Sequence, residues 1–193
     1  FYEIKFTGMV NGQPTYEDIS GPDGIPDGEI DGLDRQIVGN SLPDFSYGFN
    51  TNLTYKNFSL VTNWQGVSGN GIMNTVLRDL TLPDIEFNKL VNTRDFFPAT
   101  DDIVRFNSDR FIEDGSYLRM SNIKLSYVFN TESVKFIDAL SVYASGQNLI
   151  TITDYSGFDP EVNSFSGTDA RQGSDLGAYP SAKTFTLGVN LSF

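Results

Sequence analysis

The chain ends on a segment in which apolar residues alternate one by one with small or polar residues. In FTLGVNLSF, from Phe185 to Phe193, every odd-numbered residue is Phe, Leu or Val, and every even-numbered residue is Thr, Gly, Asn or Ser. Because successive side chains of a β-strand point to opposite faces, this pattern predicts a strand with one apolar and one polar face. Such a strand fits a membrane β-barrel between lipid and an aqueous lumen, and it also fits a half-buried strand of a soluble β-sandwich.

The same alternation predicts five further strands upstream of this one. They are expected at Tyr2–Thr7, Phe45–Tyr55, Phe58–Gln65, Asn122–Phe129 and Leu140–Gln147. Leu118 and Met120 fall on the opposite parity from the apolar residues that follow them, which predicts a β-bulge near Ser121. The sequence therefore indicates an all-β chain of six antiparallel strands.

The connections between these strands alternate between short and long. Lys56 and Asn57 form a tight turn, and Asn130 to Ala139 form a short connection. The other connections are long: 10–43, 66–115 and 149–182. Outer-membrane barrels have short periplasmic turns and longer extracellular loops, whereas compact soluble domains rarely carry several loops beyond about 15 residues. With Phe193 on the periplasmic side, every long loop would be extracellular.

Composition narrows the classes of function. Aromatic residues make up 13% of the chain, with 16 Phe and 9 Tyr, and such residues favour strands and form the aromatic girdles of membrane barrels. The net charge of −12 argues against nucleic acid as a partner, since binding phosphates requires a basic face. No run approaches the roughly 20 apolar residues of a membrane-spanning helix.

The absence of cysteine and histidine removes much chemistry. The chain has 0 Cys and 0 His, which excludes Cys or Ser–His nucleophiles and zinc sites of the usual ligand types. Carboxylate pairs such as Glu113 with Asp114 remain, but nothing in their sequence context points to catalysis. We therefore expect no catalytic residues and no enzymatic activity in this chain.

Five blocks of the sequence, which cover most of the chain, carry a resemblance to a known family. They are GNSLPDFSYGF (39–49), YKNFSL (55–60), SDRFIEDGSYLRMSNIKLSY (108–127), SGQNLITITDYSGFDPEV (145–162) and GAYPSAKTFTLGVNLSF (177–193). In this order, the blocks resemble the C-terminal portion of SusC-like TonB-dependent outer-membrane transporters of Bacteroidetes. The resemblance implies a large barrel closed by an N-terminal plug and energised through the TonB complex. It also implies a SusD-like surface lipoprotein that caps the barrel and hands over oligosaccharides or peptides.

Residues 1–193 would then be the C-terminal part of such a transporter, with membrane lipid around them. Six strands are far fewer than the roughly 22 of a plugged outer-membrane transporter, and the plug and the TonB-contacting segment are not among these residues. Six strands cannot close around a lumen, and exposed sheet edges in lipid would leave backbone groups unbonded. We therefore expect Tyr2–Met9 and Thr184–Ser192 to pair with strands outside this chain, with Phe1 as a processed terminus or a boundary within a longer polypeptide.

The segment GPDGIPDGEIDGLD, from Gly21 to Asp34, has the spacing of a calcium-binding loop. The expected metal ligands are the side chains of Asp23, Asp27, Asp31 and Asp34 and the backbone carbonyl of Glu29. Position three of this loop is Ile25, which cannot bind a metal, and position twelve is Asp rather than Glu. The alternative is a set of surface turns rich in Gly, Asp and Pro. Calcium is the one cofactor that the sequence predicts.

The long connection 66–115 contains a candidate helix. From Gly71 to Asn92, the apolar residues Ile72, Val76, Leu77 and Leu80 lie at helical spacing, and Pro83 interrupts the pattern. This helix would pack within its own loop or, alternatively, on the barrel mouth or against the lid lipoprotein.

The sequence thus favours an outer-membrane β-barrel segment that takes part in nutrient import. The alternative of another class is a secreted soluble β-sandwich that binds carbohydrate or a protein partner, with calcium in a supporting role. The two folds differ in where their apolar faces point. A β-sandwich buries these faces between its two sheets, whereas a membrane barrel turns them outward to lipid.

Overall fold

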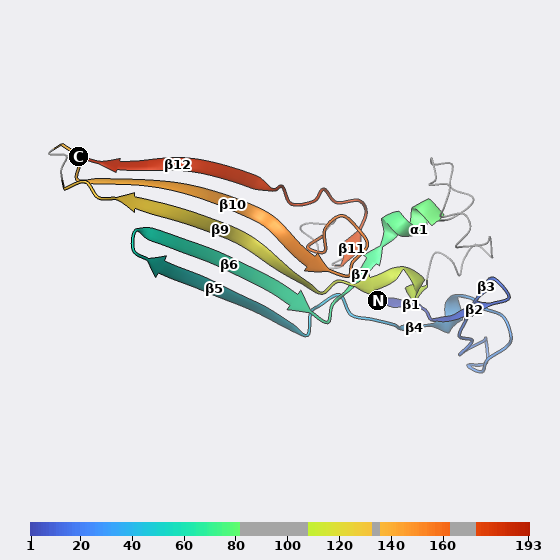
Figure 1. Cartoon of the computed structure of the whole chain (residues 1–193). Helices are drawn as coiled ribbons and strands as arrows, with labels where there is room; N and C mark the ends of the chain where they lie inside the picture. Colours follow the sequence, from blue (N-terminus) through green and yellow to red (C-terminus); the bar gives the residue numbers. More distant parts are fainter. Residues whose placement is uncertain (82–107, 133–135, 163–172) are drawn as a thin grey trace. The chain divides into compact units, whose positions relative to one another are not determined.

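A computed structural model describes residues 1–81, 108–132, 136–162 and 173–193 (Figure 1). The chain divides into two compact units, each made of segments that alternate along the sequence. The first unit contains residues 1–43, 69–115 and 155–179, and the second contains residues 44–68, 116–154 and 180–193. The two units are described separately below.

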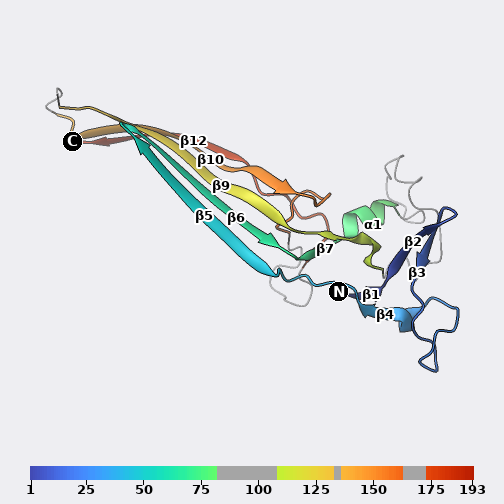
Figure 2. The ribbon, with the colours of Figure 1, turned by 60° about the horizontal axis from the view of Figure 1, so that its bottom comes forward.

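The second unit is a single antiparallel sheet of five strands in the order β12-β10-β9-β6-β5. Its strands lie side by side in Figures 1 and 2, and they are β5 (Phe45–Tyr55), β6 (Phe58–Ser68), β9 (Tyr117–Phe129), β10 (Ala139–Thr153) and β12 (Thr184–Ser192). Five of the six expected strands are therefore confirmed, and each is at least as long as the alternation predicted. The antiparallel all-β fold class is confirmed with them.

The tight turn between β5 and β6 is also confirmed. Tyr55 pairs with Phe58, so that only Lys56 and Asn57 lie between the strands, and Lys56 has a positive φ of 53°. The Asn57 side chain donates from Nδ2 to the Val128 carbonyl at 2.6 Å, and the Val128 N–H donates to the Asn57 carbonyl at 2.9 Å. These bonds join the turn to β9 and so fix its position at the end of the sheet.

The predicted bulge lies at Ser121. Asn122 pairs with Asn63 of β6, but the next pair along is Met120 with Trp64, so Ser121 has no partner in the ladder. The Ser121 hydroxyl donates instead to the Asn63 carbonyl at 3.1 Å. One extra residue reverses the parity of a strand, and this brings Met120 to the same face as the apolar residues on the other side of the bulge.

Among its described residues, the first unit contains short strands and three short helical segments. Two-stranded sheets form from β1 (Tyr2–Ile4) with β4 (Arg35–Ile37) and from β2 (Phe6–Val10) with β3 (Gln13–Tyr16), and a three-stranded sheet forms from β7 (Gly71–Asn74), β8 (Ile112–Asp114) and β11 (Ser174–Asp175). The helical segments are η1 (Gly32–Asp34), α1 (Thr75–Thr81) and η2 (Asp109–Phe111). The core of this unit consists of the buried side chains Ile4, Ile72, Met73, Phe111 and Tyr155.

The expectation that Tyr2–Thr7 is a strand of the barrel sheet is wrong. This segment forms β1 and part of β2, which pair with β4 and β3 rather than with the five-stranded sheet. The chain reverses at Asn11 and Gly12, whose φ values of 53° and 80° are those of a tight hairpin turn. An alternation of six residues was too short to distinguish a strand of a long sheet from two short strands.

The candidate helix is confirmed only from Thr75 onward. Gly71–Asn74 is the strand β7, and Ile72 is buried in the core from that strand. The Leu77 N–H donates to Asn74 Oδ1 at 2.9 Å, so Asn74 caps the first turn of α1 and ends the strand at the same residue. Residues 82–92 of the expected helix lie outside the described residues. No helix among the described residues is long and apolar enough to cross a membrane.

Candidate functional site

The register of the five-stranded sheet gathers most of the large apolar residues of the five strands on one face. One row across the sheet runs through five aligned residues, which are Leu53, Leu60, Leu125, Ala144 and Leu187. Residues two positions away on each strand lie on the same face, because side chains alternate with a period of two. We call this surface the apolar face; its other large members include Phe49, Trp64, Ile123, Tyr127, Val142, Phe185 and Val189.

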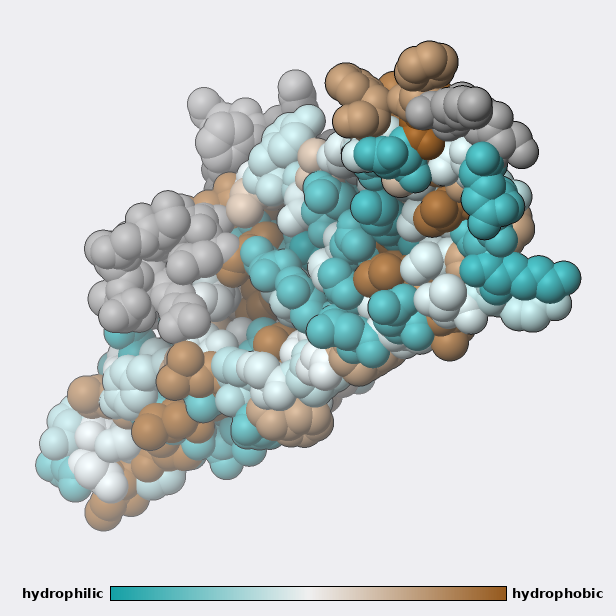
Figure 3. Space-filling model, turned by 90° about the vertical axis from the view of Figure 1, so that its left-hand side faces the viewer, coloured by the Kyte–Doolittle hydropathy of each residue, from teal (hydrophilic) through white to brown (hydrophobic). Residues whose placement is uncertain are grey.

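Many side chains of the apolar face are exposed. Leu187 is 85% exposed, Phe185 is 76% exposed and Leu53 is 59% exposed. In the space-filling view of Figure 3, apolar residues form patches on the visible surface. So many exposed apolar side chains on one face of a sheet are unusual for a protein in water and mark contact with a membrane or another protein.

Aromatic side chains gather near both ends of the apolar face. Near the hairpin turns they are Tyr55, Phe58, Tyr127 and Phe129, with ring centroids 4.7 Å apart for Phe58 and Tyr127. Near the other end they are Phe45, Tyr47, Phe49 and Trp64, with Phe49 stacked on Trp64 at 5.7 Å. Trp64 lies six positions after Phe58 in β6, a distance of about 20 Å along the strand. This arrangement matches the aromatic girdles that border the apolar band, about 25 Å tall, of a membrane barrel.

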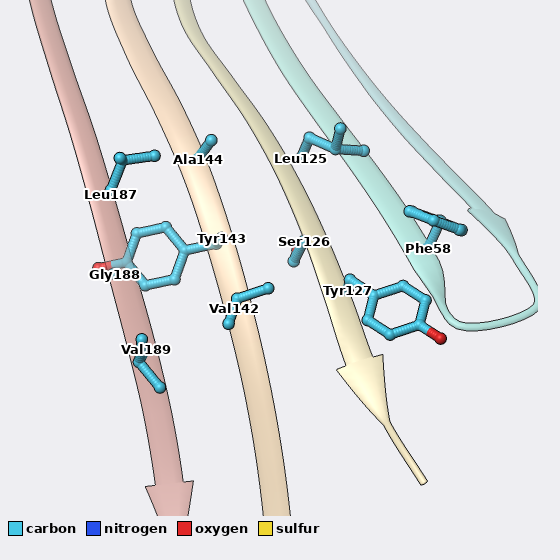
Figure 4. A pocket seen from close by; sticks show the side chains of 10 residues that line it. All are labelled: Phe58, Leu125, Ser126, Tyr127, Val142, Tyr143, Ala144, Leu187, Gly188 and Val189. Carbon is cyan, nitrogen blue, oxygen red and sulfur yellow. The ribbon is translucent and has the colours of Figure 1, made fainter.

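A shallow groove of about 540 Å³ crosses the sheet (Figure 4). Its apolar walls are Phe58, Leu125, Tyr127, Val142, Leu187 and Val189, with the small Ala144 between the larger side chains. The hollow results from side-chain size: Ala144 stands in a row whose other members are all leucines.

Tyr143 lies on the opposite face of β10 and covers a glycine on the neighbouring strand. Gly188 pairs with Tyr143, and a Cβ atom at Gly188 would overlap the Tyr143 ring, which crosses β12 in Figure 4. A second tyrosine packs over a glycine on the apolar face. There the Tyr47 ring lies over Gly66, and the Tyr47 hydroxyl donates to the Tyr117 carbonyl at 2.9 Å. In both places the absence of a side chain on glycine lets a tyrosine ring lie flat on the sheet.

The face opposite the apolar face carries mostly amides and hydroxyls, and we call it the polar face. Its residues include Asn50, Asn52, Ser59, Asn63, Gln65, Asn122, Ser126, Ser141, Ser145, Gln147, Thr186 and Asn190. Arg119 and Lys124 are the charged residues in the five strands, and both belong to β9 and to this face. The polar face is therefore suited to contact with water or polar ligands.

The first unit contains a network of polar side chains between segments far apart in the sequence. The Asn74 amide donates to Glu113 Oε1 at 2.8 Å, and Ser156 donates to the same carboxylate through its N–H and its hydroxyl, both at 2.8 Å. The buried Tyr155 hydroxyl donates to Asp175 Oδ2 at 2.6 Å. Burial, the hydrogen bond and the negative charge of Asp175 raise the pKa of Tyr155 far above its ordinary value, so its hydroxyl stays protonated. These bonds hold β7, β8 and β11 together.

Two of the predicted calcium ligands, Asp31 and Asp34, lie together, and both accept hydrogen bonds from backbone N–H groups. Asp34 is fully buried, and its carboxylate accepts hydrogen bonds from the N–H groups of Ile19 at 2.8 Å, Ser20 at 3.1 Å and Asp31 at 2.8 Å. Asp31 in turn accepts from the Leu33 N–H at 2.7 Å, which completes a capping box around η1. Burial alone would raise the pKa of Asp34, but these backbone hydrogen bonds outweigh it and lower the pKa below its ordinary value.

The other three predicted ligands are exposed. Asp27 accepts from the Glu29 N–H at 3.0 Å, and the side chains of Asp23, Asp27 and Glu29 face solvent. Within the part of the chain that the structure describes, no group of three or more Asp, Glu, His or Cys side chains is placed to hold a metal ion. Calcium binding by this loop stays a prediction. The Asp31-x-x-Asp34 spacing is the signal from which the capping box could have been predicted.

Proteins with similar sequences carry names of one kind. TonB-dependent receptor P3 of Formosa agariphila is 35% identical over 86% of this chain and 18% of its own length. TonB-dependent receptor SusC of Bacteroides thetaiotaomicron is 30% identical over 86% of this chain and 17% of its own length. No protein-family model matches the chain. The relatives are named as receptors rather than enzymes, which confirms the expectation of a non-enzymatic chain.

Solved structures show the same fold over the whole chain. The RagAB peptide importer in its closed-closed state has a TM-score of 0.76 with 24% identity, covering 100% of this chain and 23% of that one. A second structure of the RagAB peptide transporter has a TM-score of 0.78 with 22% identity, covering 100% of this chain and 22% of that one. The chain spans less than a quarter of the length of these relatives. The two-faced sheet, its aromatic borders and these similarities agree: the chain is related to SusC-like TonB-dependent receptors, and its fold is that of part of their barrel.

Proposed function

We propose that this chain supplies the C-terminal strands and long loops of a TonB-dependent importer in the bacterial outer membrane. The observation that carries the proposal is the five-stranded sheet with an exposed apolar face bordered by aromatic residues and a polar face on the other side. In a barrel, the apolar face contacts lipid and the polar face lines the lumen. A soluble β-sandwich would bury the apolar face, whereas here its members Leu187 and Phe185 are exposed.

The direction of the chain supports an orientation in the membrane. The antiparallel register puts the turn at Lys56 and Asn57 and the connection 130–138 at one end of the sheet. The two long connections, from β6 to β9 and from β10 to β12, and the segment that leads into β5 lie at the other end. Because outer-membrane barrels have short periplasmic turns, we assign the end with the short turns to the periplasm and the long connections to the cell exterior.

The edges of the sheet support a longer barrel. Among the described strands, β5 and β12 each pair on one side only. An edge strand within lipid would leave its backbone N–H and C=O groups without partners, at a cost of several kcal/mol each. The remaining strands and the plug therefore come from the rest of the transporter polypeptide, and β12 and β5 pair with strands of that polypeptide.

The relatives support a proposal for the cargo and the partners. RagAB is described as a peptide importer, which supports peptides as the cargo, and the resemblance to SusC-like transporters implies oligosaccharides as the alternative. A SusD-like surface lipoprotein would cover the extracellular end, and the TonB complex would supply energy from the periplasmic side. This chain performs no bond chemistry in that scheme.

Uptake by cells tests the proposal. Cells that produce the intact transporter should import fluorescently labelled oligopeptides or oligosaccharides, and import should stop when TonB is deleted or the proton gradient is dissipated. A matched strain in which the codons for β12 are deleted should retain no transporter in the outer membrane. Import that continues without TonB, or a transporter that stays in the soluble fraction, would contradict the proposal.

A further inference from the structure

The groove on the apolar face lies close to the tight turn between β5 and β6. Phe58, which forms one wall of the groove, is the first residue of β6 after that turn. Asn57 of the turn exchanges hydrogen bonds with Val128 of β9, the residue that follows Tyr127 in another wall of the groove. The groove therefore begins next to the end of the sheet that carries the short turns.

Lys56 adds a positive charge at the turn end of the groove. Its side chain is exposed, and its ammonium lies 5.4 Å from the centroid of the Tyr55 ring. Tyr55 pairs with Phe58 of the groove wall, and paired strands lie only about 4.8 Å apart. We propose that the groove binds an acyl chain of a glycerophospholipid whose phosphate contacts Lys56. This inference rests on the proposed function, in which the apolar face contacts lipid.

The Lys56 ammonium is available to an anion from the membrane. The salt bridges between described residues join Lys5 to Glu17 and Arg78 to Asp79, so Lys56 has no ion pair among the described residues. A cation–π contact leaves the N–H donors on the far side of an ammonium group available for a further acceptor. A phosphate oxygen is a favourable acceptor, because a charge-assisted hydrogen bond is about twice as strong as a neutral one.

The size and lining of the groove fit an acyl chain. Its volume of about 540 Å³ lies in the range of small-molecule sites, about 300–1,000 Å³. Its side walls are mostly apolar, and Ala144 leaves a hollow between Leu125 and Leu187 in the same row (Figure 4). A chain seated between side chains gains dispersion contacts on several sides, whereas a chain on a flat surface gains them on one.

The order of groups at this end of the sheet matches that of a phospholipid. In the proposed orientation the short turns are periplasmic, and the periplasmic leaflet of an outer membrane consists of glycerophospholipids. Aromatic side chains such as Tyr55 and Tyr127 mark the level of the head groups. Lys56 follows Tyr55 at the turn, and the apolar groove extends from there toward Leu125 and Leu187. The cation thus lies where a phosphate is expected, and the groove lies where the acyl chains begin.

Photocrosslinking of lipids to the purified intact transporter tests the inference. One probe is a phosphatidylethanolamine with a diazirine in one acyl chain, and the other is a diacylglycerol with the same chains and no phosphate. Mass spectrometry of peptides measures the crosslink yield on β9 and β10 at 50 mM and 500 mM salt. The variants are K56Q, K56R and A144L, which fills the hollow. The controls are Thr51→Leu, which adds bulk on the apolar face outside the groove, and K124Q, which removes a cation from the polar face.

We expect the phospholipid to crosslink to β9 and β10 roughly threefold to tenfold more than the diacylglycerol at low salt, and this preference should shrink at high salt. K56Q should remove the preference, and K56R should keep it. A144L should lower the yield of both lipids on these strands, whereas Thr51→Leu and K124Q should leave both yields unchanged.

Equal yields of the two lipids in the wild type would overturn the inference, and so would a preference that K56Q leaves intact. Crosslinks spread evenly over the apolar face would also overturn it. If A144L does not assemble, the wild-type comparison and the variants of the exposed Lys56 decide. Import that depends on TonB remains a separate measurement, so failure here leaves the proposed function standing.

Discussion

The two units of this chain use apolar residues in opposite ways. In the first unit, Ile4, Ile72 and Phe111 are buried, as in an ordinary water-soluble domain. In the second unit, the large side chains of the apolar face, such as Phe185 and Leu187, are exposed along a sheet with a polar opposite face. The first unit thus has a buried apolar core, whereas the second unit has an apolar face on its surface that fits an apolar environment. Segments of the two units alternate along the sequence. Whether an apolar side chain is buried or exposed therefore depends on the unit to which it belongs.

The two units also differ in how they use acidic residues. The first unit uses the carboxylates of Asp34, Glu113 and Asp175 to bind backbone and side-chain donors across long sequence distances. The strands of the second unit contain no Asp or Glu. Removing a carboxylate from the first unit should therefore destabilise it through lost hydrogen bonds. Adding a charged residue to the sheet of the second unit should have an effect that depends on the face that carries it.

The largest effect should follow from an arginine placed on the apolar face. Leu187→Arg lies about midway between the aromatic borders, where burial of an arginine in lipid costs roughly 2–4 kcal/mol. Thr186→Arg is the matched control, because this residue lies at the same depth on the polar face. The amount of intact transporter assembled in the outer membrane, measured by heat-modifiable gel mobility, should fall strongly for Leu187→Arg and little for Thr186→Arg. Equal amounts of the two variants would contradict the assignment of faces.

A similar loss is expected in the first unit when its buried carboxylate is removed. Asp34→Ala leaves three backbone N–H groups without their acceptor and should destabilise the loop by about 2–3 kcal/mol. Hydrogen exchange at Ile19 and Ser20 should accelerate accordingly, while membrane assembly stays unchanged. Asp27→Ala is the control, since this exposed side chain accepts from one N–H only two residues away. Unchanged exchange in Asp34→Ala would show that the buried carboxylate does not stabilise the loop.

A smaller effect is expected where Tyr143 covers Gly188. Gly188→Ala forces the ring away from the sheet and should reduce stability in lipid vesicles by about 1–2 kcal/mol. In the Tyr143→Ala background the same change should have almost no effect, because the overlapping ring is gone. Denaturant unfolding of the four proteins forms a double-mutant cycle that measures this coupling. Additive losses would mean that the ring does not restrict the glycine.

Acid should weaken the first unit before it affects the sheet. The pKa of Asp34 is lowered from its ordinary value of 3.8, so its stabilising contribution is complete above that value and is lost as the pH falls through the lowered pKa. Hydrogen exchange at Ser20, corrected for its intrinsic pH dependence, should therefore accelerate below about pH 4. Asp34→Asn should remove most of this dependence, whereas a pH dependence equal to that of the wild type would exclude Asp34 as its source.

Calcium is expected to have the smallest effect. If the loop 21–34 binds this ion, calorimetry should detect binding of millimolar strength that Asp23→Asn weakens, in the range of weak extracellular sites. Asp44→Asn, outside the loop, serves as the control. An absence of binding heat at millimolar calcium would leave the loop as a set of turns fixed by the capping box of Asp31 and Asp34.

The sheet was predictable from sequence because long strands repeat one signal many times. Strands of nine to 15 residues alternate consistently, and even the bulge at Ser121 appears as a change of parity. The first unit was less predictable because its strands have two to five residues. Ile72 satisfied a helical spacing although it lies in a strand. The Asn11–Gly12 dipeptide was the available signal for the hairpin of β2 and β3.

The contacts of the first unit could not be derived from the sequence. Glu113 and Ser156 are 43 positions apart in the sequence, and no local pattern predicts the hydrogen bonds between them. The spacing of acids in the loop 21–34 suggested a metal, but the backbone N–H groups near Asp34 are donors that a sequence pattern does not reveal. The two faces of the sheet, in contrast, follow directly from the parity of each strand, which is why the candidate membrane surface was predictable residue by residue.

The connection between β6 and β9 is closed at its base. Val67 pairs with Tyr117, the Gly115 N–H donates to the Asn70 carbonyl at 2.8 Å, and Gly71 pairs with Asp114. The residues that follow Asn74 and precede Ser108 therefore leave and rejoin the protein at a fixed pair of backbone positions. Lengthening such a segment adds only a slowly growing entropy of loop closure. The backbone pairing at both ends of the connection should therefore stay in place when the length of the intervening segment is changed.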